Sequence, residues 1–164
     1  MKPRDFVLWG MTFVIFILMT YLVYQRELLA VNGRVVLLEL APVDPRSLIQ
    51  GDYMRLRYAL ADDIADHTNL ERGFVVVQLD FNNVARFVRI HDPAKPLTAS
   101  QVLLPFRGSG TWDMQIGSKS YFMQEGHAEY YDDAKYGEMR LSDSGTLMLV
   151  GLRDDHFNLL GPPK

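Results

Sequence analysis

Cysteine is absent from this 164-residue chain. Its absence excludes disulfide bonds, thiolate metal sites and thiol catalysis together. A surplus of basic charge is missing as well, because 17 lysines and arginines face 20 acidic residues and the formal charge is −3. Nucleic-acid binding depends on concentrated positive charge, so the composition argues against a nucleic-acid partner. Internal repeats and low-complexity tracts are also absent.

Charge is missing entirely from one long stretch near the N-terminus. Residues 6–24, FVLWGMTFVIFILMTYLVY, contain no acidic or basic side chain. As an α-helix this stretch spans about 28 Å, close to the hydrocarbon thickness of a bilayer. The sequence therefore predicts a transmembrane signal anchor over residues 6–24, with the lipid bilayer as its partner.

Two other interpretations fit this stretch less well. A cleaved signal peptide has an apolar core of about 7–15 residues and a small-x-small cleavage site, and residues 25–30 (QRELLA) offer no such site. A core helix of a soluble domain is usually amphipathic, whereas this stretch is apolar on all sides. Trp9, Tyr21 and Tyr24 lie towards its ends, where aromatic residues anchor helices at membrane interfaces. We therefore favour retention of the segment as an anchor.

The flanking charges predict the orientation of the anchor. Lys2 and Arg4 precede it, whereas Arg26 is offset by Glu27 just after it. The positive-inside bias therefore favours a cytoplasmic N-terminus of residues 1–5, with the chain from about residue 25 onward outside. Lys2, Arg4 and Asp5 contribute +1 to the total, so residues 25–164 carry a formal charge of −4.

The rest of the chain is long enough for one domain with a core but hardly for two. We expect a juxtamembrane segment over residues 25–34, a β-rich domain over 35–160 and a tail over 161–164. The fold class predicted is mainly β, a barrel or sandwich-like domain with one or two short helices, preceded by a single transmembrane helix.

Hydrophobic periodicity and turn residues predict the individual elements. Residues 80–83 (DFNN) and 142–145 (SDSG) are turn sequences, and each is expected to join a hairpin. Short helices are expected over 62–67 and 123–135, the second weakened by Gly126. Strands are expected over 35–40, 52–60, 74–79, 84–90, 101–106, 111–116, 137–141 and 146–153.

Three segments resemble those of a known family. Residues 51–58 spell GDYMRLRY, which matches the pattern GDYxxLxY, and residues 42–48 (PVDPRSL) are similar to the lead-in of that motif. Residues 121–128 (YFMQEGHA) are similar to a second block of the same family. The chain thus resembles the bacterial GDYXXLXY proteins over nearly its whole length. This resemblance implies a membrane-anchored protein found alongside multi-span membrane proteins, and it implies no enzymatic activity.

The motif has a structural interpretation and a functional one. Gly51 permits a tight turn, and Asp52 can then accept hydrogen bonds from the preceding turn around Pro45 and Arg46. Leu56 and Tyr58 alternate inward along the strand expected over residues 52–60, and Tyr53 lies on its other face. We favour this architectural reading. The alternative is a ligand groove lined by three side chains, those of Asp52, Arg55 and Arg57.

A weaker local resemblance concerns the type I signal peptidases, which place a Gly-Asp turn before a β-strand. Their catalysis needs a serine with a neighbouring lysine base. By the spacing to Gly51, the serine position falls on Val43 and the lysine position near Val88 or Arg89. Arginine cannot serve as the base because it does not lose its proton. The resemblance thus implies at most a shared β scaffold, with Ser47 as an unfavoured displaced nucleophile.

A second candidate site is the polar cluster Glu125, His127 and Glu129, to which Arg57 is a candidate neighbour. On a strand the three clustered side chains share one face, and on a helix His127 points away from the two glutamates. Carboxylate and imidazole groups suit zinc, but the spacing matches no established ligand motif. The alternative is an ordinary polar contact between Glu125 and either Arg140 or Arg86. We predict no metal and no cofactor.

The sequence as a whole indicates an accessory or interaction protein of the bacterial inner membrane, with its domain in the periplasm. A multi-span membrane protein is the expected partner, and the sequence does not settle whether the chain self-associates. Two alternatives remain open at this point: a hydrolase or metal-dependent enzyme, and a binding module for a small ligand or peptide.

Overall fold

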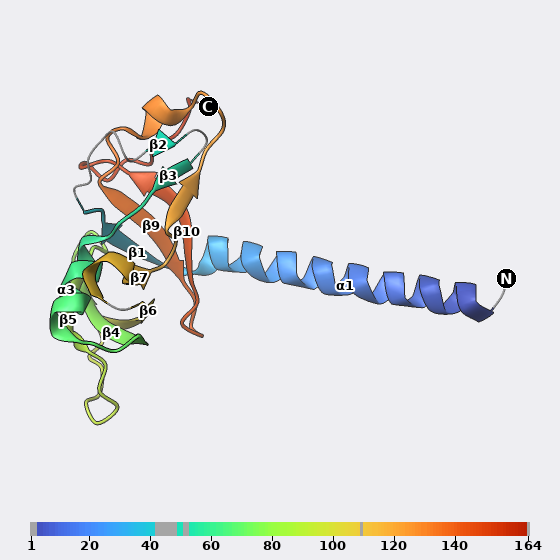
Figure 1. Cartoon of the computed structure of the whole chain (residues 1–164), viewed down its shortest axis with the longest axis horizontal. Coiled ribbons are helices and arrows are strands. Elements are labelled where there is room, and N and C mark those ends of the chain that lie inside the picture. Colours follow the sequence, from blue (N-terminus) through green and yellow to red (C-terminus); the bar gives the residue numbers. More distant parts are fainter. Residues whose placement is uncertain (1–2, 42–48, 51–52, 109, 164) are drawn as a thin grey trace.

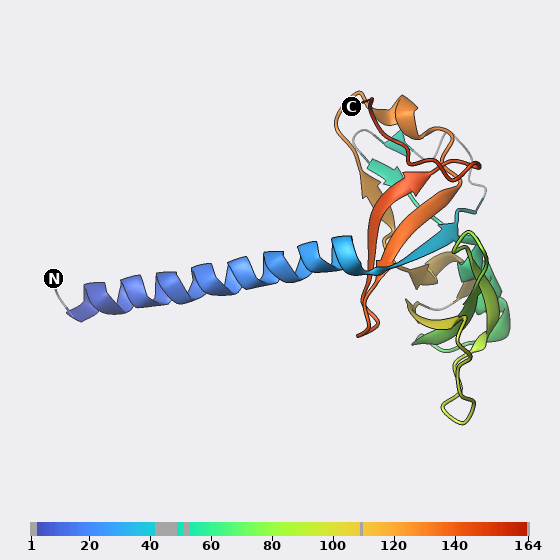
Figure 2. The same cartoon turned by 180° about the vertical axis from the view of Figure 1, so that it is seen from behind.

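The computed structural model describes residues 3–41, 49–50, 53–108 and 110–163. A long helix, α1 (Pro3–Asn32), projects from one side of a small β-rich domain, as Figures 1 and 2 show from opposite sides. Within the described residues α1 is the one helix long and apolar enough to cross a membrane, over Trp9–Asn32, and none of that segment is buried in the protein. The predicted apolar helix is thus present.

The helix continues through the segment expected to be juxtamembrane. Residues 25–31 (QRELLAV) contain neither glycine nor proline and are mostly good helix formers. The helix ends at Asn32, and Gly33 alone separates it from the first strand, β1 (Arg34–Glu39). The domain therefore follows α1 without a flexible linker.

The strands of the domain form three small antiparallel sheets. The first has the order β1-β9-β10, the second β2-β3-β8 and the third β5-β4-β6-β7. A parallel bridge between Leu37 and Val84 joins the first sheet to the third, and a bridge between Leu40 and Tyr58 ties β1 to the motif segment. The bounds are β2 (Ile49–Gln50), β3 (Tyr53–Arg55), β4 (Arg72–Leu79), β5 (Ala85–Ile90), β6 (Gln101–Arg107), β7 (Gln115–Ile116), β8 (Ser120–Phe122), β9 (Tyr136–Leu141) and β10 (Leu147–Arg153).

Helix α3 (Ala59–His67) packs between the third sheet and β1 and contributes Leu60, Ala61 and Ile64 to the core. Two shorter helical segments are α4 (Gly110–Asp113) and the 3-10 helix η1 (Ala128–Tyr131). The core contains the fully buried side chains of Val36, Leu38, Ile64, Val75, Val77, Leu104, Ile116, Met139 and Leu152. The predicted class, a mainly β domain with short helices after an apolar N-terminal helix, is confirmed.

Both predicted hairpins are confirmed. β4 and β5 pair antiparallel around a turn in which Asp80 Oδ1 accepts hydrogen bonds from the amides of Asn82 (2.8 Å) and Val84 (2.9 Å). β9 and β10 pair around residues 142–145, where Gly145 has a φ of +84°. A side chain with a Cβ disfavours that conformation, so glycine suits this place in the turn.

Three element predictions are wrong in extent or type. The strand expected over residues 52–60 ends at Arg55, and α3 begins at Ala59 because residues 59–66 (ALADDIAD) favour a helix and bury its apolar side. The helix expected over 123–135 is reduced to the four residues of η1, since Gly126 adopts a φ of +81°, outside the helical region. The strand expected over 111–116 is divided between α4 and β7.

Candidate functional site

The motif is only partly described by the structure. Gly51, Asp52, Pro45 and Arg46 lie outside the described residues, as does Ser47, so the predicted Asp52 latch stays a prediction. The second half of the motif is well defined. Two of its side chains, Leu56 and Tyr58, are 8% and 3% exposed respectively, as the alternation of the sequence predicts.

Tyr58 joins three parts of the domain. Its hydroxyl donates a hydrogen bond to the carbonyl of Ser118 (3.0 Å), in the loop between β7 and β8. Its ring packs so closely on Gly137 of β9 that a Cβ there would lie 3.1 Å from Tyr58 Cε1. The Tyr58 carbonyl accepts a hydrogen bond from Ala61 at the start of α3 (2.9 Å). The final tyrosine of the motif therefore has an architectural role.

The charged side chains of the motif segment that the structure describes are those of Arg55 and Arg57. Arg57 forms an ion pair with Asp62 of α3. Tyr53 is half-buried, and its ring lies 6.0 Å from that of Phe122 on β8, which is 77% exposed. Arg55 is exposed on β3. This end of the domain thus presents aromatic surface beside the motif.

The cluster of Glu125, His127 and Glu129 does not assemble in the described structure. Both glutamates are exposed, and the ring of His127 packs edge-on against Tyr130 with 5.5 Å between centroids. The alternative contact of Glu125 with Arg140 or Arg86 is wrong, because these arginines pair with Glu138 and Glu39. His127 lies at the start of η1 instead of on a strand, so the face-sharing geometry needed for a metal site is absent from these residues.

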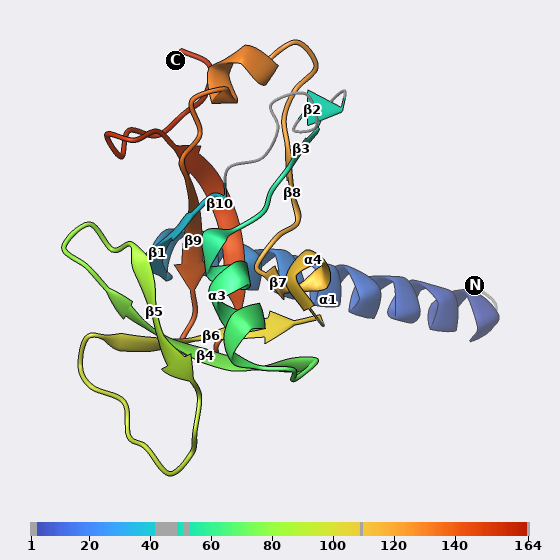
Figure 3. The same ribbon diagram turned by 60° about the vertical axis from the view of Figure 1, so that its left-hand side comes forward.

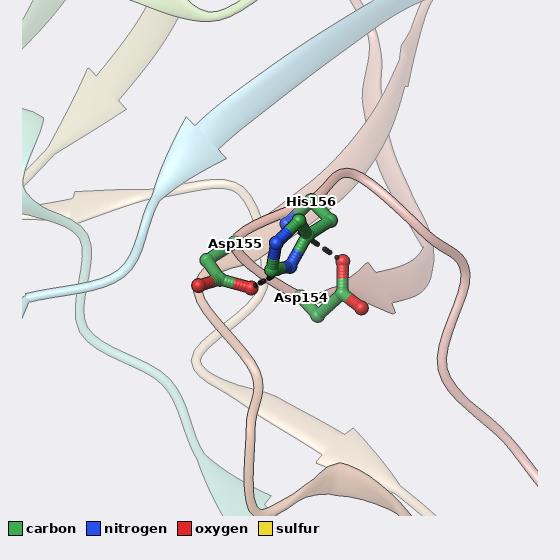
Figure 4. A group of neighbouring side chains, drawn as sticks. All are labelled: Asp154, Asp155 and His156. Carbon is green, nitrogen blue, oxygen red and sulfur yellow. Dashed lines mark hydrogen bonds and ion pairs between the residues drawn. The ribbon is translucent and has the colours of Figure 1, made fainter.

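One other cluster of potential metal ligands lies in the described part of the chain, in the surface turn after β10 (Figure 4). His156 Nδ1 lies 2.5 Å from Asp155 Oδ1, and both side chains are largely exposed. Asp154 Oδ1 accepts hydrogen bonds from the amides of His156 (2.9 Å) and Asn158 (2.8 Å). The pKa of Asp154 lies below its usual value, chiefly because the Asn158 side-chain amide donates to Oδ2 and also because these two backbone amides donate to Oδ1. The carboxylate is therefore occupied in shaping the turn.

The junction between α1 and the first sheet holds a buried charged cluster that the sequence did not single out. Glu138 of β9 is 3% exposed. Its Oε1 lies 3.1 Å from Arg140 Nη2, and its Oε2 accepts a hydrogen bond from Arg153 Nε at 2.7 Å. Arg140 Nη1 donates to the carbonyl of Gly33 at 3.3 Å. The cluster therefore connects both strands of the hairpin, β9 and β10, to the end of α1.

Glycine is required at position 33 because the junction has no room for a side chain. A Cβ at this position would lie 2.6 Å from the carbonyl oxygen of Leu29 and 2.8 Å from Arg140 Cβ. Such distances are shorter than real van der Waals contacts, so a larger residue must displace the helix end or the strand. The end of α1 thus packs closely against the sheet at Gly33.

Gly33→Ala is therefore expected to destabilise the junction by about 1–3 kcal/mol, the usual cost of overpacking. Hydrogen exchange of the full chain in detergent should become faster at residues 29–34, and the free energy of unfolding should fall. Gly10→Ala is the matched control, because a Cβ at Gly10 meets nothing within 4 Å. Equal behaviour of the two variants would show that the junction tolerates rearrangement.

Comparison with known proteins gives one family. The family described as "GDYXXLXY protein" matches residues 15–152, which include most of the apolar helix and nearly all of the domain. No curated protein and no solved structure matches the chain. The weaker resemblance to signal peptidases therefore receives no support.

Proposed function

The chain belongs to the GDYXXLXY protein family, and from this premise we propose that it is a membrane-anchored accessory protein of the bacterial inner membrane, with its domain in the periplasm. Its role is to hold an interaction surface at a set position beside a multi-span membrane protein. The observation that carries this proposal is the anchor itself: an exposed apolar helix that passes into the sheet through one residue, Gly33.

Rigid attachment favours a positional role over a tethered one. A domain on a flexible linker samples many orientations, whereas this domain is connected to α1 through Arg140 and through the close packing at Gly33. A partner in the same membrane would then meet the same face of the domain each time. Restricting orientation in this way lowers the entropy cost of binding.

The exposed aromatic surface beside the motif supports the interaction role. Phe122 is 77% exposed on the edge strand β8, next to the half-buried ring of Tyr53. Exposed aromatic side chains are enriched where proteins bind one another, and an edge strand offers free backbone groups to a partner strand. This surface is our first choice for the contact with the partner.

The proposal is tested by photo-crosslinking of the full chain in its own membrane. A crosslinking residue at Phe122 is expected to capture one multi-span protein that also co-purifies in detergent in a fixed ratio. The same residue at Phe81, which is fully exposed at the tip of the β4–β5 hairpin, is the matched control and should capture little. Equal labelling at both positions, together with measurable peptide hydrolysis, would support the enzyme alternative instead.

The orientation has its own test. A reporter enzyme that works only in the periplasm is expected to be active when it is fused after Lys164. One that works only in the cytoplasm is expected to be inactive there. Activity confined to the cytoplasm would reverse the topology inferred from the charges around Lys2 and Arg4.

A further inference from the structure

Two arginines lie directly opposite each other in the third sheet. Arg72 opens β4, Arg107 closes β6, and the two are partners in the antiparallel register. Gln115 of β7 pairs with Arg107 on its other side. Directly paired residues of antiparallel strands project from the same face. The three side chains therefore leave one face of the sheet as a row across three strands, in which the two arginines are direct neighbours.

This row lines an open cleft of about 680 Å³. Lys119, in the loop between β7 and β8, adds a third cation to the lining, and Glu71 and Asp113 add two carboxylates. Lys119 Nζ lies 3.4 Å from Asp113 Oδ1, but both side chains are more than half exposed. A pair in that setting contributes little and holds its partners weakly.

The two arginines are not neutralised by the protein in the described residues. Arg107 Nε donates to Gln115 Oε1 at 3.1 Å, which is a neutral partner. Neither Arg72 nor Arg107 is among the ion pairs that the described residues form. Like charges placed directly opposite across two strands repel each other. An anion between the guanidinium groups would remove that repulsion, and guanidinium groups recognise phosphate through paired hydrogen bonds.

The cleft lies on the side of the domain that meets the anchor. α1 ends against Arg140, and the turn after β9 begins two residues later. Gly145 of that turn and Leu147 just after it line a smaller groove together with Arg107 and Gln115. The arrowhead of β6 also points to the side on which α1 leaves the domain (Figure 3). The strand end that carries Arg107 thus lies on the side of the domain from which α1 leaves.

The distance to the membrane is short. Eight residues of helix follow Tyr24 before α1 ends at Asn32, a rise of about 12 Å. The headgroup layer on each side of a bilayer is roughly 5–8 Å thick. The side of the domain that adjoins the end of α1 therefore lies close to the headgroups. Leu70 and Phe74, on either side of Arg72 in the chain, are 54% and 45% exposed, and such apolar groups beside cations favour an interface with lipid.

We propose that Arg72, Arg107 and Lys119 form a site for the phosphate of an anionic lipid headgroup. The inference rests on the membrane anchoring of the proposed function but not on its protein partner. Arg72 and Arg107 hold the phosphate between them, Gln115 orients Arg107, and Lys119 exchanges Asp113 for the ligand. The site fixes the domain against the membrane surface at a second point, away from α1.

The test compares lipids added to the full chain in a neutral detergent. Phosphatidylglycerol is expected to raise the melting temperature, since a ligand of the folded state stabilises it, and phosphatidylcholine should have little effect. Arg72→Gln/Arg107→Gln should weaken the apparent affinity for phosphatidylglycerol at least tenfold. Without lipid this variant should melt no lower than the parent, because it loses a repulsive pair. Arg86→Gln/Lys95→Gln removes the same charge elsewhere in the third sheet and its loops and should keep the lipid effect.

Each other outcome overturns the lipid site. Equal loss in both double variants would show a general charge effect. Inorganic phosphate that stabilises the chain as well as phosphatidylglycerol does would make the cleft a site for a soluble anion. An acidic peptide that stabilises it when the lipid does not would make it a protein-binding surface. In each case capture of the partner through Phe122 is measured separately, so the lipid site can fail while the proposed function stands.

Discussion

Replacing Glu138 with alanine is expected to lower the free energy of unfolding by about 3–5 kcal/mol, the usual cost of removing one partner from a buried ion pair. The carboxylate is 5% exposed in its side chain, and the two arginines that it pairs with are only 23% and 28% exposed. Without Glu138 both guanidinium groups would remain partly buried next to each other, with no opposite charge between them. The cost arises from these uncompensated cations.

The effect should extend beyond the strand that carries Glu138. Arg153 also donates to the carbonyl of Phe157 in the turn after β10, and Arg140 donates to Gly33 at the end of α1. Loss of the central carboxylate leaves two neighbouring cations that repel each other, which weakens both of these contacts. Faster hydrogen exchange is therefore expected in the turn over residues 154–158 and at the junction between α1 and β1, in addition to β9.

The measurement is denaturant unfolding of the full chain in detergent. Glu39→Ala provides the control, because Glu39 forms a comparable contact with Arg86 (2.7 Å) in which both side chains are about half exposed. That pair should contribute less than about 1 kcal/mol. Glu138→Gln keeps the size of the side chain and loses its charge, so it should fall between the two. A loss below 1 kcal/mol for Glu138→Ala would contradict the role given to the cluster.

Local patterns account for the parts of the fold that the sequence predicts. The apolar stretch, both hairpins and the inward direction of Leu56 and Tyr58 depend on residues close together in the chain, where periodicity and turn chemistry decide the outcome. The strand expected over residues 52–60 was predicted too long. The alternation of Leu56, Tyr58 and Leu60 is compatible with burial of these side chains from either a strand or a helix. Leu60 is buried as expected, but from α3.

Long-range pairing accounts for most of what the sequence did not predict. Glu138 and Arg140 are two residues apart on a strand and share a face, which is a readable signal. The contribution of Arg153 and the carbonyl of Gly33 depends on how β1 and β10 lie beside β9, which the sequence does not reveal. The pairing of Arg72 with Arg107 likewise requires the register of β4 and β6. Of the predicted polar cluster, Arg57 pairs locally with Asp62, and Glu125 and Glu129 remain on the surface.

Tyr58→Ala is expected to be as damaging as the loss of Glu138, at about 3–5 kcal/mol, the range found when a large buried aromatic side chain is removed. The ring is 3% exposed and fills the space over Gly137, which has no side chain of its own to fill it. Tyr58→Phe keeps the ring and removes only the hydrogen bond to Ser118, so it should cost about 1 kcal/mol. The two variants separate packing from hydrogen bonding.

The dependence of stability on pH distinguishes Tyr58→Phe further. Burial raises the pKa of Tyr58 above its ordinary value of 10.0, so the folded state keeps the phenol proton at a pH where the unfolded state loses it. Stability linked to this group is present below pH 10 and falls above it, by at most about 1.4 kcal/mol per pH unit. Phenylalanine cannot ionise. The stability of Tyr58→Phe should therefore approach that of the parent as the pH rises above 10.

Tyr121 supplies the internal comparison for this experiment. Burial and a hydrogen bond with Tyr131 raise the pKa of Tyr121 to about 12. Tyr121 therefore lowers the free energy of unfolding somewhat at alkaline pH in both the parent and Tyr58→Phe. Unfolding of the two full chains in detergent at a series of pH values should thus give curves that both decline, with the parent declining more steeply. Parallel curves would show that Tyr58 ionises as readily in the folded domain as in the unfolded chain. The architectural role of the motif would then depend on residues other than its final tyrosine.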